Sequence, residues 1–274
     1  MVTDEQFVRL FNRVFNDWGE LDFFQWKYSE NPFGDNIVQY AIEDDELVAS
    51  RIFMSWIMHH GEQPLGCYQA TDSATLKSYR GKGLFKRLTL ECLDQLRESD
   101  FVFNFPNQNS LGTYVKLGWK CVENIRPLIV PTVNYFFSKS AVAATEASDF
   151  FIGTQWHDKL LKWRFANGKN YQSFNVDRQR LFTYRMLSVK GVRVADVIQT
   201  HPELTLTDLK QFFQALRLQD IFAIRYMGLN TAMRALIENN VLISFYFGSG
   251  VNFVTKGAPE AARFRVEMID ADYI

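Results

Sequence analysis

The chain has 274 residues, 47% of them hydrophobic, which is enough for one large folded core or two smaller ones and excludes a disordered chain. Its 30 lysines and arginines nearly balance its 31 aspartates and glutamates, so no overall field favours nucleic acid or an anionic membrane as a partner. The three cysteines are odd in number and widely separated, which argues against a disulfide framework and a structural zinc site. We expect buried thiols and no metal.

The N-terminal segment MVTDEQFVRLFNRVFNDW is charged and amphipathic, and it lacks the apolar core of a secretory signal. Apolar runs such as FVFNFP and VLISFYF are far shorter than the roughly 20 residues that span a membrane. We therefore expect a cytoplasmic protein with no membrane partner.

The first half of the sequence predicts a helix, a hairpin and then alternating strands and helices. Apolar residues recur at helical spacing from Phe7 to Phe15, and Thr3 with Gln6 has the pattern of a capping box. Two extended runs around an acidic turn predict a hairpin over 37–60. A strand over 66–76, a helix over 84–96, a strand over 101–106, a helix over 109–117 and a strand over 119–125 follow. This order predicts an α/β fold of the α+β layer type.

The second half repeats this order. FFQWKYSEN in the first half is echoed by LLKWRFANG, and both have two apolar residues, a polar one, tryptophan, a base and an aromatic residue. Paired strands over 171–189, a helix over 207–216, a strand over 220–227 and a helix over 230–239 come next. We predict two units, over residues 1–137 and 151–274, joined by a linker over 138–150. The alternative is a chance recurrence in a chain with 25 phenylalanines and 6 tryptophans.

The segment TLKSYRGKGLFK places two glycines around a lysine where a strand gives way to a helix. Gly81 and Gly83 let the backbone turn tightly, so that N–H groups from Arg80 to Leu84 can converge on an anion. The helix N-terminus and Lys82 add positive charge. The spacing is neither that of a Rossmann fingerprint nor that of a P-loop. Taken alone, the segment also fits a solvated surface turn.

With NQNSLGTYVKLGW downstream, the stretch 68–119 resembles the GNAT acyltransferase superfamily. The family has a Q/R-x-x-G-x-G/A loop and an N-x-x-A-x-x-x-Y-x-K-x-G-F helix. The matching positions are Arg80, Gly81, Gly83, Asn107, Tyr114, Lys116 and Gly118. The sequence departs from the family at Ser78, Ser110 and Trp119. Ser78 removes one side-chain contact to phosphate and leaves the backbone cradle intact.

The resemblance implies a GNAT-like mixed, mostly antiparallel sheet flanked by helices, and acetyl-CoA as co-substrate. The implied cofactor-binding residues are Ala74, Thr75 and Leu76 for the pantetheine arm, Arg80, Gly81, Lys82, Gly83 and Leu84 for the pyrophosphate, and Asn107. Tyr114 matches the position of the family's general acid, although its ring could serve packing alone. Asp72 is the nearest candidate for the base, and a water molecule is the alternative.

The resemblance implies an N-acyltransferase that moves an acetyl group from acetyl-CoA to a primary amine of an unidentified acceptor. We expect a small-molecule amine, with amino sugars, amino acids, small amines and protein N-termini all open. The second unit lacks the glycine pair in TLTDLKQFF, so we expect it to be a degenerate module. Two alternatives are a non-catalytic acyl-CoA-binding or interaction module and a transferase that uses aminoacyl-tRNA. The balanced charge gives no sign of a basic face for RNA, and we expect no nucleic-acid partner.

Overall fold

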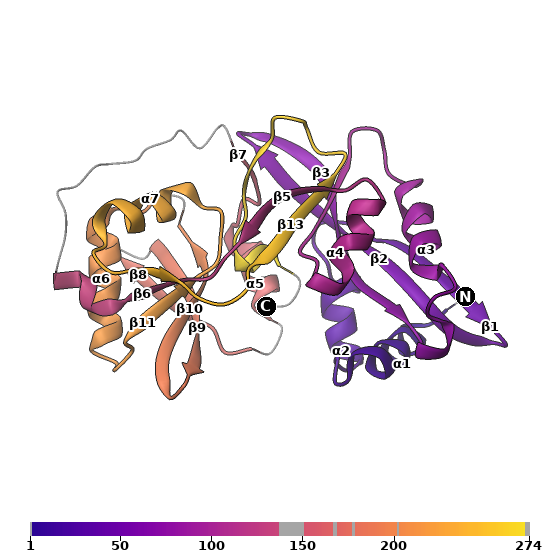
Figure 1. Cartoon of the computed structure of the whole chain (residues 1–274), viewed down its shortest axis with the longest axis horizontal. Coiled ribbons are helices and arrows are strands. Elements are labelled where there is room, and N and C mark those ends of the chain that lie inside the picture. Colours follow the sequence, from indigo (N-terminus) through magenta and orange to yellow (C-terminus); the bar gives the residue numbers. More distant parts are fainter. Residues whose placement is uncertain (1, 137–150, 167–168, 177–178, 202, 272–274) are drawn as a thin grey trace.

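The computed structural model describes residues 2–136, 151–166, 169–176, 179–201 and 203–271, and these form two β-sheets flanked by helices (Figure 1). The α-helices are α1 (Asp4–Phe15), α2 (Leu21–Phe24), α3 (Leu84–Leu93), α4 (Gln108–Lys116), α5 (Asp158–Arg164), α6 (Leu206–Arg217) and α7 (Thr231–Asn240). A π-helical turn, η1 (Gln25–Ser29), continues α2.

The first sheet contains β1 (Ile37–Glu43), β2 (Glu46–His60), β3 (Gln63–Thr75), β4 (Phe101–Asn104), β5 (Lys120–Ile125), β7 (Phe151–Gly153), β13 (Val251–Lys256) and β14 (Arg263–Arg265). Its strand order is β14-β7-β2-β3-β4-β13-β5, and β1 also pairs with β2. The second sheet contains β6 (Leu128–Pro131), β8 (Gln172–Val176), β9 (Gln179–Val189), β10 (Val192–Thr200), β11 (Ala223–Tyr226) and β12 (Phe245–Tyr246), in the order β12-β6-β11-β10-β9-β8.

Both sheets are mixed and mostly antiparallel, as the resemblance implies. The parallel pairs within the described residues are β3 with β4, β10 with β11, and β14 with β7. Side chains along β2 alternate between two faces: Phe53 shares a buried cluster with Cys92 of α3 and Tyr114 of α4, whereas Trp56 packs on the opposite face against Phe33 and Phe103. Helices α6 and α7 cover the second sheet (Figure 1).

Each sheet contains a strand from the other half of the sequence. β6 follows β5 along the chain but lies in the second sheet, where it pairs with β11 and β12. β13 lies in the first sheet between β4 and β5, with Val254 opposite Asn104 and Cys121. The predicted linker over 138–150 lies outside the described residues, and the predicted boundaries of the two units stay a prediction.

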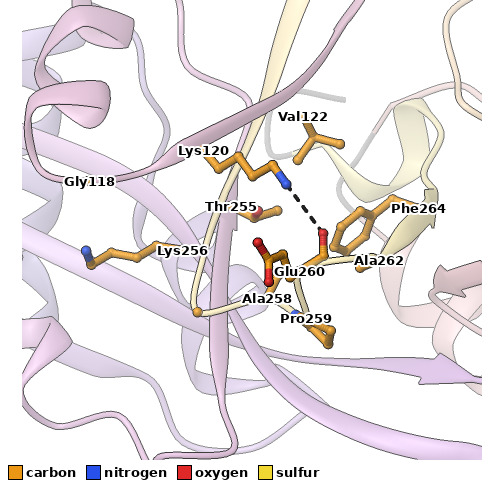
Figure 2. A pocket seen from close by; sticks show the side chains of 11 residues that line it. Gly118, Lys120, Val122, Thr255, Lys256, Ala258, Pro259, Glu260, Ala262 and Phe264 are labelled. Carbon is orange, nitrogen blue, oxygen red and sulfur yellow. Dashed lines mark hydrogen bonds between the residues drawn. The ribbon is translucent and has the colours of Figure 1, made fainter.

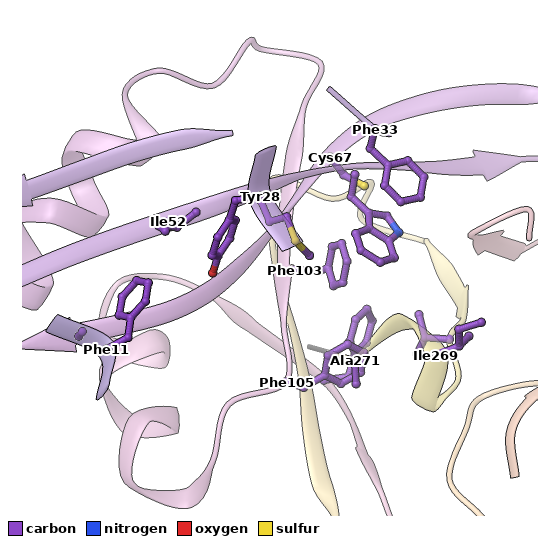
Figure 3. Packing of buried hydrophobic residues seen from close by; sticks show 14 of the residues in the cluster. Phe11, Tyr28, Phe33, Ile52, Cys67, Phe103, Phe105, Ile269 and Ala271 are labelled. Atoms are coloured by element: carbon purple, nitrogen blue, oxygen red, sulfur yellow. The ribbon is translucent and has the colours of Figure 1, made fainter. Parts of the chain in front are cut away.

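The repeated tryptophan motifs meet each other at the centre of the molecule. Trp26 Nε1 donates to the carbonyl oxygen of Trp163 at 2.7 Å, and Trp163 Nε1 donates to that of Trp26 at 2.9 Å. The residue after each tryptophan is a buried cation, Lys27 or Arg164, and Arg164 Nε donates to the carbonyl of Ile269 at 3.0 Å. The C-terminal segment joins this core, where Figure 3 shows Ala271 beside Phe105, the residue that follows β4.

The predicted elements are largely confirmed. The capping box is present, with the Thr3 backbone N–H donating to Gln6 Oε1 at 2.9 Å. The structure adds β10, the short strands β6, β7 and β14, and the π-helical turn. Cys67 and Cys92 are buried as expected, but Cys121 is exposed, because β5 is the last strand of the first sheet and is exposed along most of its length.

Two buried carboxyl groups lie in the C-terminal segment that joins the two sheets. Glu267 is 8% exposed; its Oε2 accepts from the Thr200 N–H at 2.9 Å, and its Oε1 accepts from the Tyr226 hydroxyl at 3.0 Å. Burial is the main cause that raises the pKa of Glu267 to about 7 and the pKa of Asp270 to about 6.

We expect stability to fall as the pH rises through about 7. A raised pKa means that the folded protein holds the Glu267 proton more tightly, so the stabilisation is complete below the unfolded value of 4.5 and lost above about 7. The change amounts to roughly 3 kcal/mol. Glutamine cannot ionise, so Glu267→Gln should flatten the pH dependence of the free energy of unfolding measured in urea. Glu62→Gln, on the surface, should leave that pH dependence unchanged. A Glu267→Gln variant with the wild-type slope would contradict this assignment.

Candidate active site

A pocket opens where two parallel strands of the first sheet part. β3 and β4 pair only from Cys67 to Gln69 and from Phe101 to Phe103. Beyond this point β3 continues to Thr75, whereas β4 ends and the chain turns into α4. The pocket, called the Tyr114 pocket below, has a volume of about 440 Å³. It is lined by Phe15, Arg51, Ala70, Thr71, Asp72, Ser73, Phe85, Asn104, Phe105, Pro106, Asn107, Ser110, Thr113 and Tyr114.

A β-bulge in β3 forms one wall of this pocket. Ser50 lies opposite Ala74 and Ile52 opposite Thr71, so Arg51 of β2 faces two residues of β3. One of them, Asp72, has a φ of 26°, outside the extended range of its neighbours. A bulge bends a strand and turns a side chain away from its regular direction. Here it brings the Asp72 carboxylate to the pocket.

The Asp72 carboxylate has two buried partners. Its Oδ2 lies 2.6 Å from Lys27 Nζ and accepts from the Tyr28 hydroxyl at 2.5 Å. The Lys27 side chain is 3% exposed, and the Tyr28 oxygen also lies 3.0 Å from Thr71 Oγ1. The lysine and the tyrosine come from η1, so the repeated tryptophan motif supplies the partners that fix Asp72.

Tyr114 is buried on the opposite wall, with 2% of its surface exposed. Its hydroxyl oxygen accepts from Arg51 Nη2 and from Asn104 Nδ2, both at 2.7 Å. A tyrosine hydroxyl can accept hydrogen bonds and has one proton to donate. Because both of these neighbours are donors, the hydroxyl proton is left for a third partner. Phe85 and Trp119 pack against the ring at centroid distances of 5.8 and 4.8 Å and fix its orientation.

The glycine loop has the backbone that the sequence predicts. Gly81 and Gly83 have φ values of 79° and 78°, and no atom lies within 4 Å of a Cβ added at either position. Glycine is therefore required by the left-handed backbone and not by crowding. Gly83 precedes the first residue of α3, whose N-terminal N–H groups lack helical acceptors. Arg80 Nε donates to the Thr75 carbonyl at 3.1 Å, and Lys82 Nζ lies 4.4 Å from the Tyr79 ring centroid.

Three residues selected from the sequence line the Tyr114 pocket: Asp72, Asn107 and Tyr114. Asn107 caps α4, where its Oδ1 accepts from the Ser110 N–H at 3.0 Å. The other selected residues lie at the end of β3, in the glycine loop and at the start of α3. Ala74 and Leu76 are buried, and Gly81, Lys82 and Gly83 are exposed.

The sequence reasoning missed four residues that fix these groups. Arg51 and Asn104 hold Tyr114, and Lys27 and Tyr28 hold Asp72. One of them could have been found, because Arg51 is a lone charge in the largely apolar run LVASRIFMSW of a predicted strand. Burial of such a charge in a sheet demands a partner.

A second, smaller pocket of about 230 Å³ lies between β5 and the loop after β13 (Figure 2). Lys120 Nζ donates to the Glu260 carbonyl at 3.4 Å across it, and Lys256 Nζ donates to the Leu117 carbonyl at 3.0 Å. It shares no lining residue with the Tyr114 pocket and contains neither Tyr114 nor Asp72. Within the described residues, no helix is long and apolar enough to cross a membrane.

Comparison with solved structures shows the same fold in proteins of low sequence identity. A GCN5-related N-acetyltransferase from Anabaena variabilis ATCC 29413 has a TM-score of 0.66 at 11% identity, covering 93% of this chain and 71% of that chain. A protein of Enterococcus faecalis V583 described as a probable N-acyltransferase has a TM-score of 0.65 at 10% identity, covering 92% and 69%. Eis1 from Mycobacterium abscessus has a TM-score of 0.60 at 9% identity, covering 92% and 71%.

A search of curated protein sequences gives no match. Residues 3–122 match the family model described as acetyltransferase (GNAT) domain. This range contains the glycine loop, the parting strands and the Tyr114 pocket. Residues 3–122 are therefore a GNAT acetyltransferase domain, and a second sheet follows it in the GNAT-like fold of the whole chain.

Proposed function

We propose that this protein is an N-acetyltransferase that moves an acetyl group from acetyl-CoA to a primary amine of a small molecule. The observation that carries the proposal is the Tyr114 pocket, which lies between the parting strands β3 and β4. A tyrosine with a free hydroxyl proton and a carboxylate line that one pocket, and the glycine loop follows β3 directly. An acid and a base on one cleft suit acyl transfer.

The chain fits acetyl-CoA at both ends of the cleft. The open space at the Cβ positions of Gly81 and Gly83 leaves room for phosphate beside the N-terminus of α3. We assign the pyrophosphate to residues 80–84, with Arg80 and Lys82 as cationic donors. We assign the pantetheine arm to residues 74–76, at the edge that β3 presents after it parts from β4.

Acetyl-CoA supplies the acetyl group as a thioester. Transfer forms a C–N bond to the amine and breaks the C–S bond, and the electron pair of the C–S bond stays on the leaving sulfur. Tyr114 gives its hydroxyl proton to that sulfur. The acceptor nitrogen loses a proton to Asp72 or to a water molecule that Asp72 holds. The ion pair with Lys27 keeps the Asp72 carboxylate in place.

We propose that the second sheet belongs to a degenerate GNAT module. β10 and β11 also run in parallel and part after Val197 and Tyr226. Here the C-terminal segment fills the gap, because Glu267 accepts from Thr200 on one side and forms a bridge with Gly228 on the other. The chain itself thus occupies the place that corresponds to the Tyr114 pocket.

We expect Gly83→Glu to abolish binding of acetyl-CoA, because it adds a negative side chain where the phosphate would lie and strains a left-handed backbone. Gly191→Glu is the matched control: Gly191 has a φ of 80° and equally open surroundings, but lies in the turn between β9 and β10. Isothermal titration calorimetry measures both. Unchanged affinity in Gly83→Glu would refute the pyrophosphate site.

The filled gap in the second sheet leads us to expect one CoA per chain. Calorimetric titration of the wild-type protein should saturate at one equivalent, since the second gap is closed by buried hydrogen bonds. Saturation at two equivalents would mean that the second sheet also binds the cofactor. No binding at all would refute the proposed function.

We expect Tyr114→Phe to keep the ring packing and the affinity for acetyl-CoA but to lower kcat by roughly 10²-fold, as for loss of a positioned acid. Tyr184→Phe, a buried tyrosine of the second sheet, should leave kcat unchanged. A panel of primary amines with detection of the released thiol comes first and identifies the acceptor. If no amine reacts while CoA binds tightly, a non-catalytic acyl-CoA-binding module is the better description.

A further inference from the structure

Arg51 is a buried charge in the first sheet without a carboxylate partner. It is 1% exposed, and no carboxylate of the described residues lies within 4.0 Å of its nitrogen atoms. Its Nη2 donates to the Tyr114 hydroxyl, its Nη1 donates to the Thr71 carbonyl at 3.3 Å, and its Nε has no partner. Asp72, on the bulge opposite Arg51, is paired with Lys27.

The surroundings of Arg51 compensate its charge only in part. The guanidinium carbon lies 5.1 Å from the Phe53 ring centroid, 5.3 Å from that of Phe85 and 5.5 Å from that of Tyr114. Aromatic faces attract a cation, but more weakly than a carboxylate does. The remaining positive charge faces the Tyr114 pocket, which Arg51 lines. A ligand that carries or develops negative charge there would complete the compensation.

We infer that Arg51 is a positioning residue for the leaving group of the transfer. Together with Asn104 it fixes the Tyr114 hydroxyl, and its charge balances the negative charge left on Tyr114 Oη when the proton passes to sulfur. This inference rests on the proposed function. It adds that Arg51 supplies the positive charge that balances the tyrosinate formed during transfer. The other ionisable groups at the pocket are Asp72 with its partner Lys27, which together are neutral, and Tyr114.

A double-mutant cycle tests the coupling of Arg51 to Tyr114. Arg51→Gln removes the charge and should lower kcat by roughly 10²-fold, with little change in KM for acetyl-CoA. In a Tyr114→Phe background the same change should have almost no effect, because the hydroxyl through which it acts is gone. Arg51→Lys retains the charge and should recover part of the rate. Equal losses in both backgrounds would show a structural role and overturn the inference.

Arg185→Gln is the matched control for loss of an arginine from a sheet, since Arg185 pairs with Asp196 in the second sheet. It should leave kcat unchanged in both backgrounds. Circular dichroism identifies variants that fail to fold. If Arg51→Gln does not fold, Arg51→Lys is compared in the two backgrounds in its place. We expect it to lower kcat by less than Arg51→Gln would, and to have almost no effect on kcat in the Tyr114→Phe background.

A binding measurement gives a readout that needs no acceptor. The thiol of bound CoA should ionise at lower pH in the wild type than in Arg51→Gln, because a nearby cation favours the thiolate. Thiolate absorbance of the CoA complex measures this. The same titration in both proteins would overturn the inference while leaving the proposed function intact. A wild-type protein that binds no CoA would overturn both.

Discussion

The exchange of strands between the two halves of the chain is the constraint on which the site depends. β4 is paired with β3 at its start and with β13 along its other edge, and β13 comes from the last quarter of the sequence. Since β4 ends at Asn104 and pairs with β13 on its far edge, β3 has no strand partner on its β4 side beyond Gln69, although its other edge stays paired with β2. The residues that line the Tyr114 pocket all lie between Phe15 and Tyr114, and the sheet around them is completed by β13 from the C-terminal part of the chain.

The same dependence extends to the charges around the pocket. Lys27 neutralises Asp72, and it comes from the motif whose tryptophan bonds reciprocally to Trp163 of the second half. Arg51, one strand away, has tyrosine and aromatic rings as partners in place of a carboxylate. Lys27 is neutralised by the Asp72 carboxylate, whereas Arg51 keeps a positive charge beside the Tyr114 hydroxyl. One wall of the pocket therefore has a paired carboxylate, and the other has a hydroxyl next to a cation.

The second sheet also has two parallel strands that part, but the gap between them is filled. Its parallel strands part as those of the first sheet do, yet Glu267 and the adjoining C-terminal residues bond to both sides of the gap. Buried backbone groups must find hydrogen-bond partners, and here the chain provides them. In the first sheet the corresponding edge of β3 is left beside a pocket. The contrast between the two sheets is the reason for proposing that only the first binds CoA.

The sequence by itself determined the local elements and the glycine loop. Apolar periodicity and the Thr3 capping box define α1, and the left-handed backbone at Gly81 and Gly83 follows from residue type. It also pointed to Tyr114 and Asp72. Only the tertiary structure decided which strands complete each sheet and which side chains hold those two residues. Arg51 and Tyr114 are 63 positions apart, and Lys27 and Asp72 are 45 apart. Periodicity carries no information over such separations, because strand pairing and bulge position arise from contacts among all the elements at once.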